Sequence, residues 1–267
     1  MTDILLTIAG TDPSGAAGIQ ADLQVFRDFG FHGASVITSV LWQNTVGVRG
    51  QRPVELDVLR AQLDAVLSDL AVSAIKVGLV PTAAHWDVIL DSLPAATPVV
   101  VDPVFASGDG RTPLVTQDVL DAVRRSLSRV DVVTPNAPEA AALTDVAVAT
   151  LDDALRAAEH LVALGARAVL LKAGHLSQRS QAIRDVWADA GGARLMQPLP
   201  AIEVDVRGTG CQLSSAVAAG LARGDAPFDA AESARGYLSE LLRLRRQRIG
   251  HGREVVVRVE GAPDDAD

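Results

Sequence analysis

The chain has 267 residues and a formal net charge of −9, with 48% hydrophobic and only 3% aromatic residues. This length suits one large domain with an aliphatic core, and the acidic balance argues against a nucleic-acid partner. A single cysteine excludes an internal disulfide and favours the reducing cytoplasm, which we expect as the compartment.

The apolar runs of the sequence are too short for a membrane protein. The first residues lack the basic segment of a signal peptide, and no run is long enough to cross a bilayer. We therefore expect no membrane partner and a single domain over residues 1–267, in which residues 262–267 form a frayed acidic tail.

Predicted strands and helices alternate along the chain. Short apolar runs predict strands at 4–8, 33–40, 73–77, 98–101, 130–133 and 168–171. Helical spacing of apolar residues predicts helices at 19–29, 53–70, 82–93, 117–127, 138–143, 152–164 and 228–248, and a helix from Gln212. Segments 183–187 and 194–196 are typical of a hairpin about two glycines.

This alternation predicts an α/β fold built of βαβ units, with a mostly parallel central sheet and helices on both faces. In such sheets ligands bind beyond the carboxyl ends of the strands. Six candidate residues fall at these ends, namely Gly10, Gln43, Lys76, Asp102, Asn136 and Lys172.

A glycine turn before the helix at Gln212 is the strongest single motif. Gly208-Thr209-Gly210-Cys211 lets the backbone turn tightly and approach a ligand closely. A glycine turn that opens a helix points free N–H groups and the positive end of the helix dipole at an anion, usually phosphate. A helix N-terminus also favours the thiolate of Cys211. The alternative is a structural turn with Cys211 as an apolar filler.

Lysine is rare in this chain. Of the 24 basic residues, Lys76 and Lys172 are the lysines and the rest are arginines. Both follow apolar runs that predict buried strands. They therefore indicate positions where a compact point charge is needed rather than a planar guanidinium.

Several familiar kinds of site are excluded. The chain has no G-x-x-x-x-G-K-[ST] phosphate loop, the Gly208 motif lacks the third glycine of a dinucleotide fingerprint, and no His/Cys cluster has zinc spacing. Glycine-rich anion turns with carboxylates and two lysines indicate phosphoryl transfer by a different kinase architecture.

The residues resemble those of the bacterial hydroxymethylpyrimidine and phosphomethylpyrimidine kinases of thiamine biosynthesis, in the ribokinase superfamily. The motifs that carry the resemblance are TIAGTDPSG (7–15), GIQAD (18–22), QNT (43–45), KVG (76–78), VDPV (101–104), TPN (134–136), EA (139–140), KAGH (172–175) and GTGC (208–211). The resemblance implies a ribokinase-like three-layer sandwich. It also implies ATP and Mg²⁺ as cofactors and an aminopyrimidine as the small-molecule substrate. We expect a homodimer.

On the substrate side, the resemblance implies that Gln43 grips the aminopyrimidine edge, because a carboxamide offers a donor and an acceptor side by side. It implies that Gly10 and Asp22 line the same pocket and bind the ring or its hydroxymethyl group. For Asp22 the alternative is a solvated helix carboxylate.

On the phosphate side, the resemblance implies that Gly208, Thr209, Gly210 and Cys211 form the anion hole over the γ-phosphate. Lys172 would lie near the nucleotide phosphates. Lys76 has an equal alternative as the partner in a structural ion pair. Cys211 would act either as a base or as a positioning group, and the sequence leaves both open.

The resemblance also implies a Mg²⁺ site. Asp102 would act on the metal or on water near the phosphates. Asn136 and Glu139, at helical spacing, would share one helix face near Mg²⁺. The alternative is that Asn136 caps the start of a helix.

Three departures from the family pattern stand out. Arg207 occupies the place before the glycine turn where histidine is common, which adds a fixed cation near the anion site. The loop after Val104 is shorter and lacks a lysine often found there. The glycine-rich closing segment is only faintly matched at 249–252. These departures concern loop closure and the second phosphorylation more than the fold.

The substrate leaves alternatives within and beyond the superfamily. A pyridoxine or pyridoxal kinase shares the anion hole and a hydroxymethylated aromatic ring, and Gln43 favours the pyrimidine. A pyrimidine-binding protein without activity is the other alternative, which the intact glycine turn argues against.

Overall fold

The computed structural model describes residues 3–108, 110, 112–177, 182–202 and 205–258. The predicted tail at 262–267 lies outside this part of the chain. Within the described residues, no helix is both long and apolar enough to cross a membrane.

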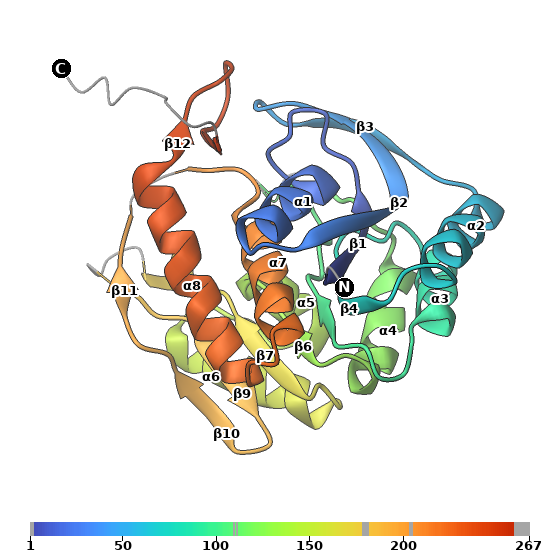
Figure 1. Cartoon of the computed structure of the whole chain (residues 1–267). Helices are drawn as coiled ribbons and strands as arrows, with labels where there is room; N and C mark the ends of the chain where they lie inside the picture. The colour runs from blue at the N-terminus through green and yellow to red at the C-terminus, as the bar shows by residue number, and fades with distance from the viewer. Residues whose placement is uncertain (1–2, 109, 111, 178–181, 203–204, 259–267) are drawn as a thin grey trace.

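A nine-stranded sheet is the centre of the described fold, in the order β10-β9-β7-β6-β5-β4-β1-β2-β3 (Figure 1). The strands from β7 to β2 run parallel, whereas β9, β10 and β3 pair antiparallel at the two edges. The bounds are β1 Ile4–Gly10, β2 His32–Gln43, β3 Val48–Pro53, β4 Val72–Val77, β5 Val99–Val101, β6 Val132–Val133, β7 Ala168–Leu171, β9 Val186–Asp189 and β10 Gly192–Leu195. The predicted mostly parallel sheet and the predicted hairpin are confirmed.

Eight α-helices in the described residues cover the two faces of this sheet. They are α1 Gly18–Asp28, α2 Leu56–Leu67, α3 Ala83–Ser92, α4 Gln117–Ser126, α5 Ala137–Thr144, α6 Leu151–Ala163, α7 Thr209–Ala222 and α8 Pro227–Leu244. Two small antiparallel sheets pair β8 Ala182–Ile183 with β11 Leu199–Pro200, and β12 Arg246–Gln247 with β13 Val255–Val256.

Alternating side chains of the strands build two cores. Val99 and Val101 of β5 pack into a core with α2 to α6, whereas Val100 packs on the opposite side with α1, α7 and α8. This alternation follows from the two-residue period of a strand, and apolar residues on both faces are typical of buried parallel strands. In Figure 1, α7 and α8 lie side by side over one face. The three-layer sandwich expected from the resemblance is confirmed.

The edge strand β3 was not predicted from the sequence. Its residues Val48–Pro53 are mostly polar, and the helix predicted from Pro53 begins only at Leu56. An edge strand has one solvated side and one free row of hydrogen-bonding groups, so it tolerates polar residues and a terminal proline. The hairpin of β2 and β3 positions Gln43 at its turn.

Candidate active site

A cavity of about 1210 Å³ opens where the parallel strands end. Its lining includes all six residues that the sequence places at strand ends, namely Gly10, Gln43, Lys76, Asp102, Asn136 and Lys172. They meet because parallel strands present their carboxyl ends at the same edge of a sheet. The prediction that these residues converge is confirmed, and this cavity is the candidate active site.

The glycine turn forms one wall of the cavity. Gly208 is the N-cap of α7 with a φ of 75°, and a Cβ atom on it would lie 1.8 Å from the carbonyl oxygen of Ala16. The helix begins at Thr209 rather than at Gln212, so Gly210 and Cys211 lie in its first turn. The first N–H groups of a helix have no partner within the helix, so this turn and the helix dipole could bind an anion in the cavity that residues 208–211 line.

A lysine and two carboxylates lie beside this turn. A Cβ atom on Gly210 would lie 3.2 Å from Lys172 Nζ and 3.5 Å from Asp102 Oδ2. Lys172 Nζ donates to Asp102 Oδ1 over 2.7 Å and lies 3.8 Å from Glu139 Oε2. Burial by itself lowers the pKa of Lys172, but the charges of Asp102 and Glu139 outweigh it and raise that pKa. Lys172 is therefore a cation beside the anion site.

Asn136 and Glu139 form a capping box at the start of α5. The Glu139 N–H donates to Asn136 Oδ1 over 2.9 Å, and the Asn136 N–H donates to Glu139 Oε2 over 2.7 Å. The capping alternative for Asn136 is thus confirmed, and each oxygen keeps a second lone pair. Burial is the main reason that the pKa of Glu139 is raised to about 7, against the opposing charge of Lys172.

Asp102 and Glu139 are the candidate ligands for a divalent cation. Both line the cavity, and carboxylate oxygens are the donors that Mg²⁺ prefers. Among the described residues, no group of three or more His, Cys, Asp or Glu side chains is arranged to hold a metal. Mg²⁺ commonly binds through one or two carboxylates together with substrate phosphates, so these residues fit a cation that arrives with a nucleotide.

Asp22 does not line the cavity, and that prediction is wrong. Its side chain has no exposed surface, because α1 turns it toward the sheet and α7. It accepts hydrogen bonds from Thr7 Oγ1 at 2.6 Å, Lys76 Nζ at 2.8 Å and Ser215 Oγ at 2.8 Å. The alternative of a solvated helix carboxylate is wrong as well. For Lys76, which still reaches the cavity wall, the structural ion-pair alternative is confirmed.

Cys211 is partly exposed at the cavity wall. Burial raises the pKa of its thiol to about 11, although the ammonium of Lys76 acts in the opposite direction. The negative charges of Asp22 and Asp102 raise this pKa further. The side chain is therefore a neutral thiol at pH 7, contrary to the thiolate that the helix N-terminus favours.

Gln43 presents part of its carboxamide to the cavity. Its Nε2 donates to the carbonyl oxygen of Thr11 over 3.3 Å, and its Oε1 accepts from Arg207 Nη2 over 2.7 Å. One N–H and one lone pair are left for a ligand. The sequence predicts Arg207 as a fixed cation near the anion site but does not reveal its contact with Gln43. The one signal was its position directly before the glycine turn.

The C-terminal hairpin closes over the turn that follows Gln43. The Gly252 N–H donates to Thr45 Oγ1 over 3.2 Å, and the Arg253 N–H donates to the Thr45 carbonyl oxygen over 3.0 Å. A Cβ atom on Gly252 would lie 2.1 Å from that carbonyl oxygen. The faintly matched segment at 249–252 therefore contacts the β2–β3 hairpin closely through its glycines.

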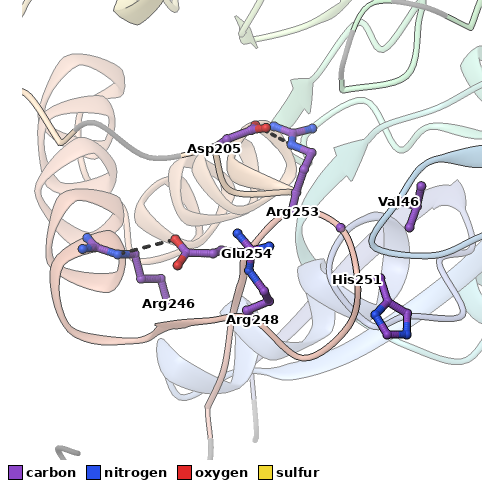
Figure 2. A pocket seen from close by; sticks show the side chains of 8 residues that line it. Val46, Asp205, Arg246, Arg248, His251, Arg253 and Glu254 are labelled. Atoms are coloured by element: carbon purple, nitrogen blue, oxygen red, sulfur yellow. Dashed lines mark ion pairs between the residues drawn. The ribbon is translucent and has the colours of Figure 1, made fainter. Parts of the chain in front are cut away.

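A second, more open hollow of about 560 Å³ lies beside this hairpin (Figure 2). There Arg246 lies 3.5 Å from the carboxylate of Glu254, and Arg253 pairs with Asp205, as the dashed lines in Figure 2 show. Arg253 also lines the main cavity, so it stands between the two hollows. Carboxylates thus offset two of the arginines in this hollow.

Comparison with known proteins places the chain among vitamin kinases. The family model described as phosphomethylpyrimidine kinase matches residues 12–257. The hydroxymethylpyrimidine/phosphomethylpyrimidine kinase of Rhizobium meliloti is 43% identical over 260 residues, 95% of this chain and 96% of the relative. That of Escherichia coli is 38% identical over 252 residues, 92% and 94% of the two chains.

Solved structures with the same fold are named either phosphomethylpyrimidine kinase or pyridoxal kinase. A phosphomethylpyrimidine kinase from Clostridium difficile is similar with a TM-score of 0.76 and 32% identity, covering 90% of this chain and 99% of the other. An ADP complex of Bacillus subtilis pyridoxal kinase has a TM-score of 0.85 at 28% identity, covering 96% and 97%.

Proposed function

The chain belongs to the phosphomethylpyrimidine kinase family, and we propose that it phosphorylates 4-amino-5-hydroxymethyl-2-methylpyrimidine with ATP, and then its monophosphate to the diphosphate, for thiamine biosynthesis. The observation that carries this proposal is one cavity lined by both Gln43 and the turn at residues 208–211. A carboxamide that can hydrogen-bond the edge of a ring and an anion site in the same cavity suit a substrate that has an aminopyrimidine edge and reacts with a phosphate.

In each transfer the substrate oxygen attacks the γ-phosphorus while the bond to the ADP oxygen breaks. The N–H groups of the first turn of α7 hold the γ-phosphate, and Lys172 offsets negative charge beside it. In the first transfer the hydroxymethyl group also loses its proton. A loose transition state needs positioning more than a strong base, so the neutral thiol of Cys211 fits a positioning role.

We propose that Asp102 and Glu139 hold Mg²⁺ on the nucleotide side of the cavity. When bound, the cation neutralises charge on the phosphates. Lys172 Nζ, 2.7 Å from Asp102 Oδ1, holds that carboxylate in place beside the cavity. Asn136 orients Glu139 through the capping box.

A pyridoxal kinase is the second candidate, because pyridoxal kinases are among the structures that the chain resembles. The same anion site serves either ring, so the choice lies at the ring edge. An aminopyrimidine offers a ring nitrogen next to an exocyclic amine, which matches the free N–H and lone pair of Gln43. Pyridoxal cannot reproduce that pair of bonds.

Steady-state turnover of ATP with the pyrimidine and with pyridoxal tests the proposal. We expect a higher kcat/KM for the pyrimidine, and Gln43→Ala to raise its KM roughly ten-fold while affecting KM for ATP less. Gln43→Met, which keeps the length of the side chain without polar atoms, should behave like Gln43→Ala. Equal losses on both substrates would show that Gln43 only supports the loop. Binding without turnover would indicate a protein that no longer catalyses.

We also propose a homodimer in the cytoplasm, formed through the outer face of the β2–β3 hairpin. Val40 and Trp42 are half exposed there and share one face of β2, and Val46 at the turn is more exposed still. Sedimentation equilibrium of the parent chain and of Trp42→Ser tests this proposal. A monomeric parent chain would contradict it.

A further inference from the structure

The contact between Arg207 and Gln43 joins distant parts of the sequence inside the cavity wall. Arg207 is buried, and its Nη2 donates to Gln43 Oε1 over 2.7 Å, a short bond with a charged donor. Gln43 comes from the end of β2, whereas Arg207 directly precedes the turn of α7. Both line the cavity.

The chemistry of its two neighbours fixes which way the carboxamide of Gln43 points. A guanidinium has only donors, so it must face the oxygen of the amide, and the Thr11 carbonyl only accepts, so it must face the nitrogen. A flipped amide would set N–H groups against the guanidinium and one carbonyl against another. The free N–H and the free lone pair are therefore offered to a ligand in one order.

We propose that Arg207 is a positioning residue that locks the Gln43 carboxamide and thereby sets the preference for an aminopyrimidine edge. The inference rests on the proposed role of Gln43 and deepens it. Without Arg207 only the longer, 3.3 Å hydrogen bond to Thr11 orients the amide, so the flipped orientation becomes more populated. Only one of the two orientations pairs with a ligand that offers a ring acceptor beside an amine donor.

Arg207 is itself held on two sides. Its backbone N–H donates over 2.9 Å to the carbonyl of Glu254, a residue drawn in Figure 2. Its guanidinium lies 3.9 Å from Asp12 Oδ2, an atom without exposed surface and without a hydrogen bond to the described residues. The other oxygen of Asp12 accepts two hydrogen bonds from Ser14. The Asp12 charge thus compensates the buried cation while leaving its donors for Gln43.

The position of Arg207 also links the ring edge to the phosphate site. Arg207 is joined by one peptide bond to Gly208, whose positive φ sets the start of α7. Arg207 therefore fixes the position of the Gln43 carboxamide relative to the anion hole. The residue that selects the substrate ring and the turn that binds phosphate are thus rigidly connected.

The test is a double-mutant cycle with two substrates. Arg207→Lys keeps the charge that Asp12 needs but replaces the planar fork with a single mobile donor group. It is measured alone and with Gln43→Ala, with the pyrimidine and with pyridoxal. Arg235→Lys is the matched control, because Arg235 is also buried and paired with an aspartate, Asp185 at 2.7 Å, and its hydrogen bonds go to Asp185 and Gln197.

We expect Arg207→Lys to raise KM for the pyrimidine about five- to ten-fold and to lower the preference over pyridoxal by a similar factor. In the Gln43→Ala background the same change should add less than about two-fold, because Arg207 acts through Gln43. Arg235→Lys should leave the preference between the two substrates unchanged. Arg207→Gln, which loses the charge, serves as a second variant if Arg207→Lys is poorly folded.

The outcomes separate the inference from the function that it deepens. If Gln43→Ala leaves the pyrimidine KM unchanged, the proposed role of Gln43 fails. If Gln43→Ala has its effect but Arg207→Lys has none, or if the two effects simply multiply, Arg207 does not position Gln43. A preference that drops equally with Arg235→Lys would assign the effect to general loss of packing.

Discussion

Lys76 Nζ lies 2.8 Å from Asp22 Oδ2, and neither side chain has any exposed surface. Burial alone would lower the pKa of Lys76, but the charges of Asp22 and Asp102 outweigh it and raise that pKa. Lys76 is therefore a cation inside the protein, paired with the carboxyl group of Asp22. A buried pair of this kind is costly to break, because the remaining charge has no solvent to compensate it.

Removing one partner of this pair should destabilise the fold strongly. We expect Lys76→Met to lower the free energy of unfolding by about 3–5 kcal/mol, since it leaves the buried carboxyl group of Asp22 without its ion-pair partner. The double variant Lys76→Met/Asp22→Leu should recover much of that loss. Urea denaturation followed by circular dichroism measures both. A loss below about 1 kcal/mol in the single variant would show that the pair is not ionised.

The two glycines of the α7 turn should respond differently to substitution. Gly208→Ala forces a Cβ against the Ala16 carbonyl in a left-handed conformation, so we expect a loss of more than about 2 kcal/mol in stability. Gly210→Val meets the flexible end of Lys172 first, so it should fold but crowd the phosphate and lower kcat by about 10²-fold or more. Melting curves and turnover of both variants are the measurements. Near-normal turnover in folded Gly210→Val would remove the anion hole from the mechanism.

Cys211 should react slowly with alkylating reagents. Its thiol pKa is about 11, against 9.0 for an ordinary thiol. At neutral pH its thiolate fraction is therefore about a hundredth of that of an ordinary thiol. Iodoacetamide labelling followed by mass spectrometry reports this residue alone, because the chain has one cysteine. Rapid labelling of the native protein at pH 7 would contradict the raised pKa. The urea-unfolded chain gives the reference rate.

Substitutions of Cys211 should distinguish positioning from base catalysis. We expect Cys211→Ser, which keeps a hydroxyl for hydrogen bonding, to retain kcat within about ten-fold. Cys211→Ala should lose more, but less than the 10²- to 10⁴-fold typical of a lost general base. The measurement is kcat at saturating substrates. Full activity of the alanine variant would leave Cys211 as packing only.

Glu139 should make the stability of the metal-free protein depend on pH. Its pKa is raised from 4.5 to about 7 in the folded state, so the folded protein holds this proton more tightly than the unfolded chain. The resulting stabilisation is complete below pH 4.5 and is lost as the pH rises through 7, a change on the order of 3 kcal/mol. Glu139→Gln keeps the capping box without an ionisable group. Its free energy of unfolding, compared with that of the parent chain in EDTA from pH 4 to 8, should lack this component.

The order of strands and helices, and the residues at the strand ends, could be predicted from the sequence. Burial on both faces makes strands such as β5 and β7 continuously apolar, and parallel connectivity then brings Gly10, Asp102 and Lys172 to one edge. The glycine turn was readable for a similar reason, because a left-handed backbone and close packing demand glycine locally. The edge strand β3 could not be predicted from the sequence. Its solvated side tolerates polar residues, so it lacks the apolar pattern by which strands are recognised.

Only the tertiary structure decided which polar side chains pair. Asp22 lies 54 positions from Lys76, and Gln43 lies 164 positions from Arg207. No local period in the sequence records contacts of that range, because they depend on how helices pack onto the sheet. The same packing withdraws Cys211 from most of its solvent and raises its thiol pKa, whereas the helix N-terminus alone would lower that pKa. The sequence by itself thus determined the strands, helices and glycine turn, because these depend on local backbone conformation. Burial of side chains and the pairing of distant polar groups depended on how the helices pack onto the sheet.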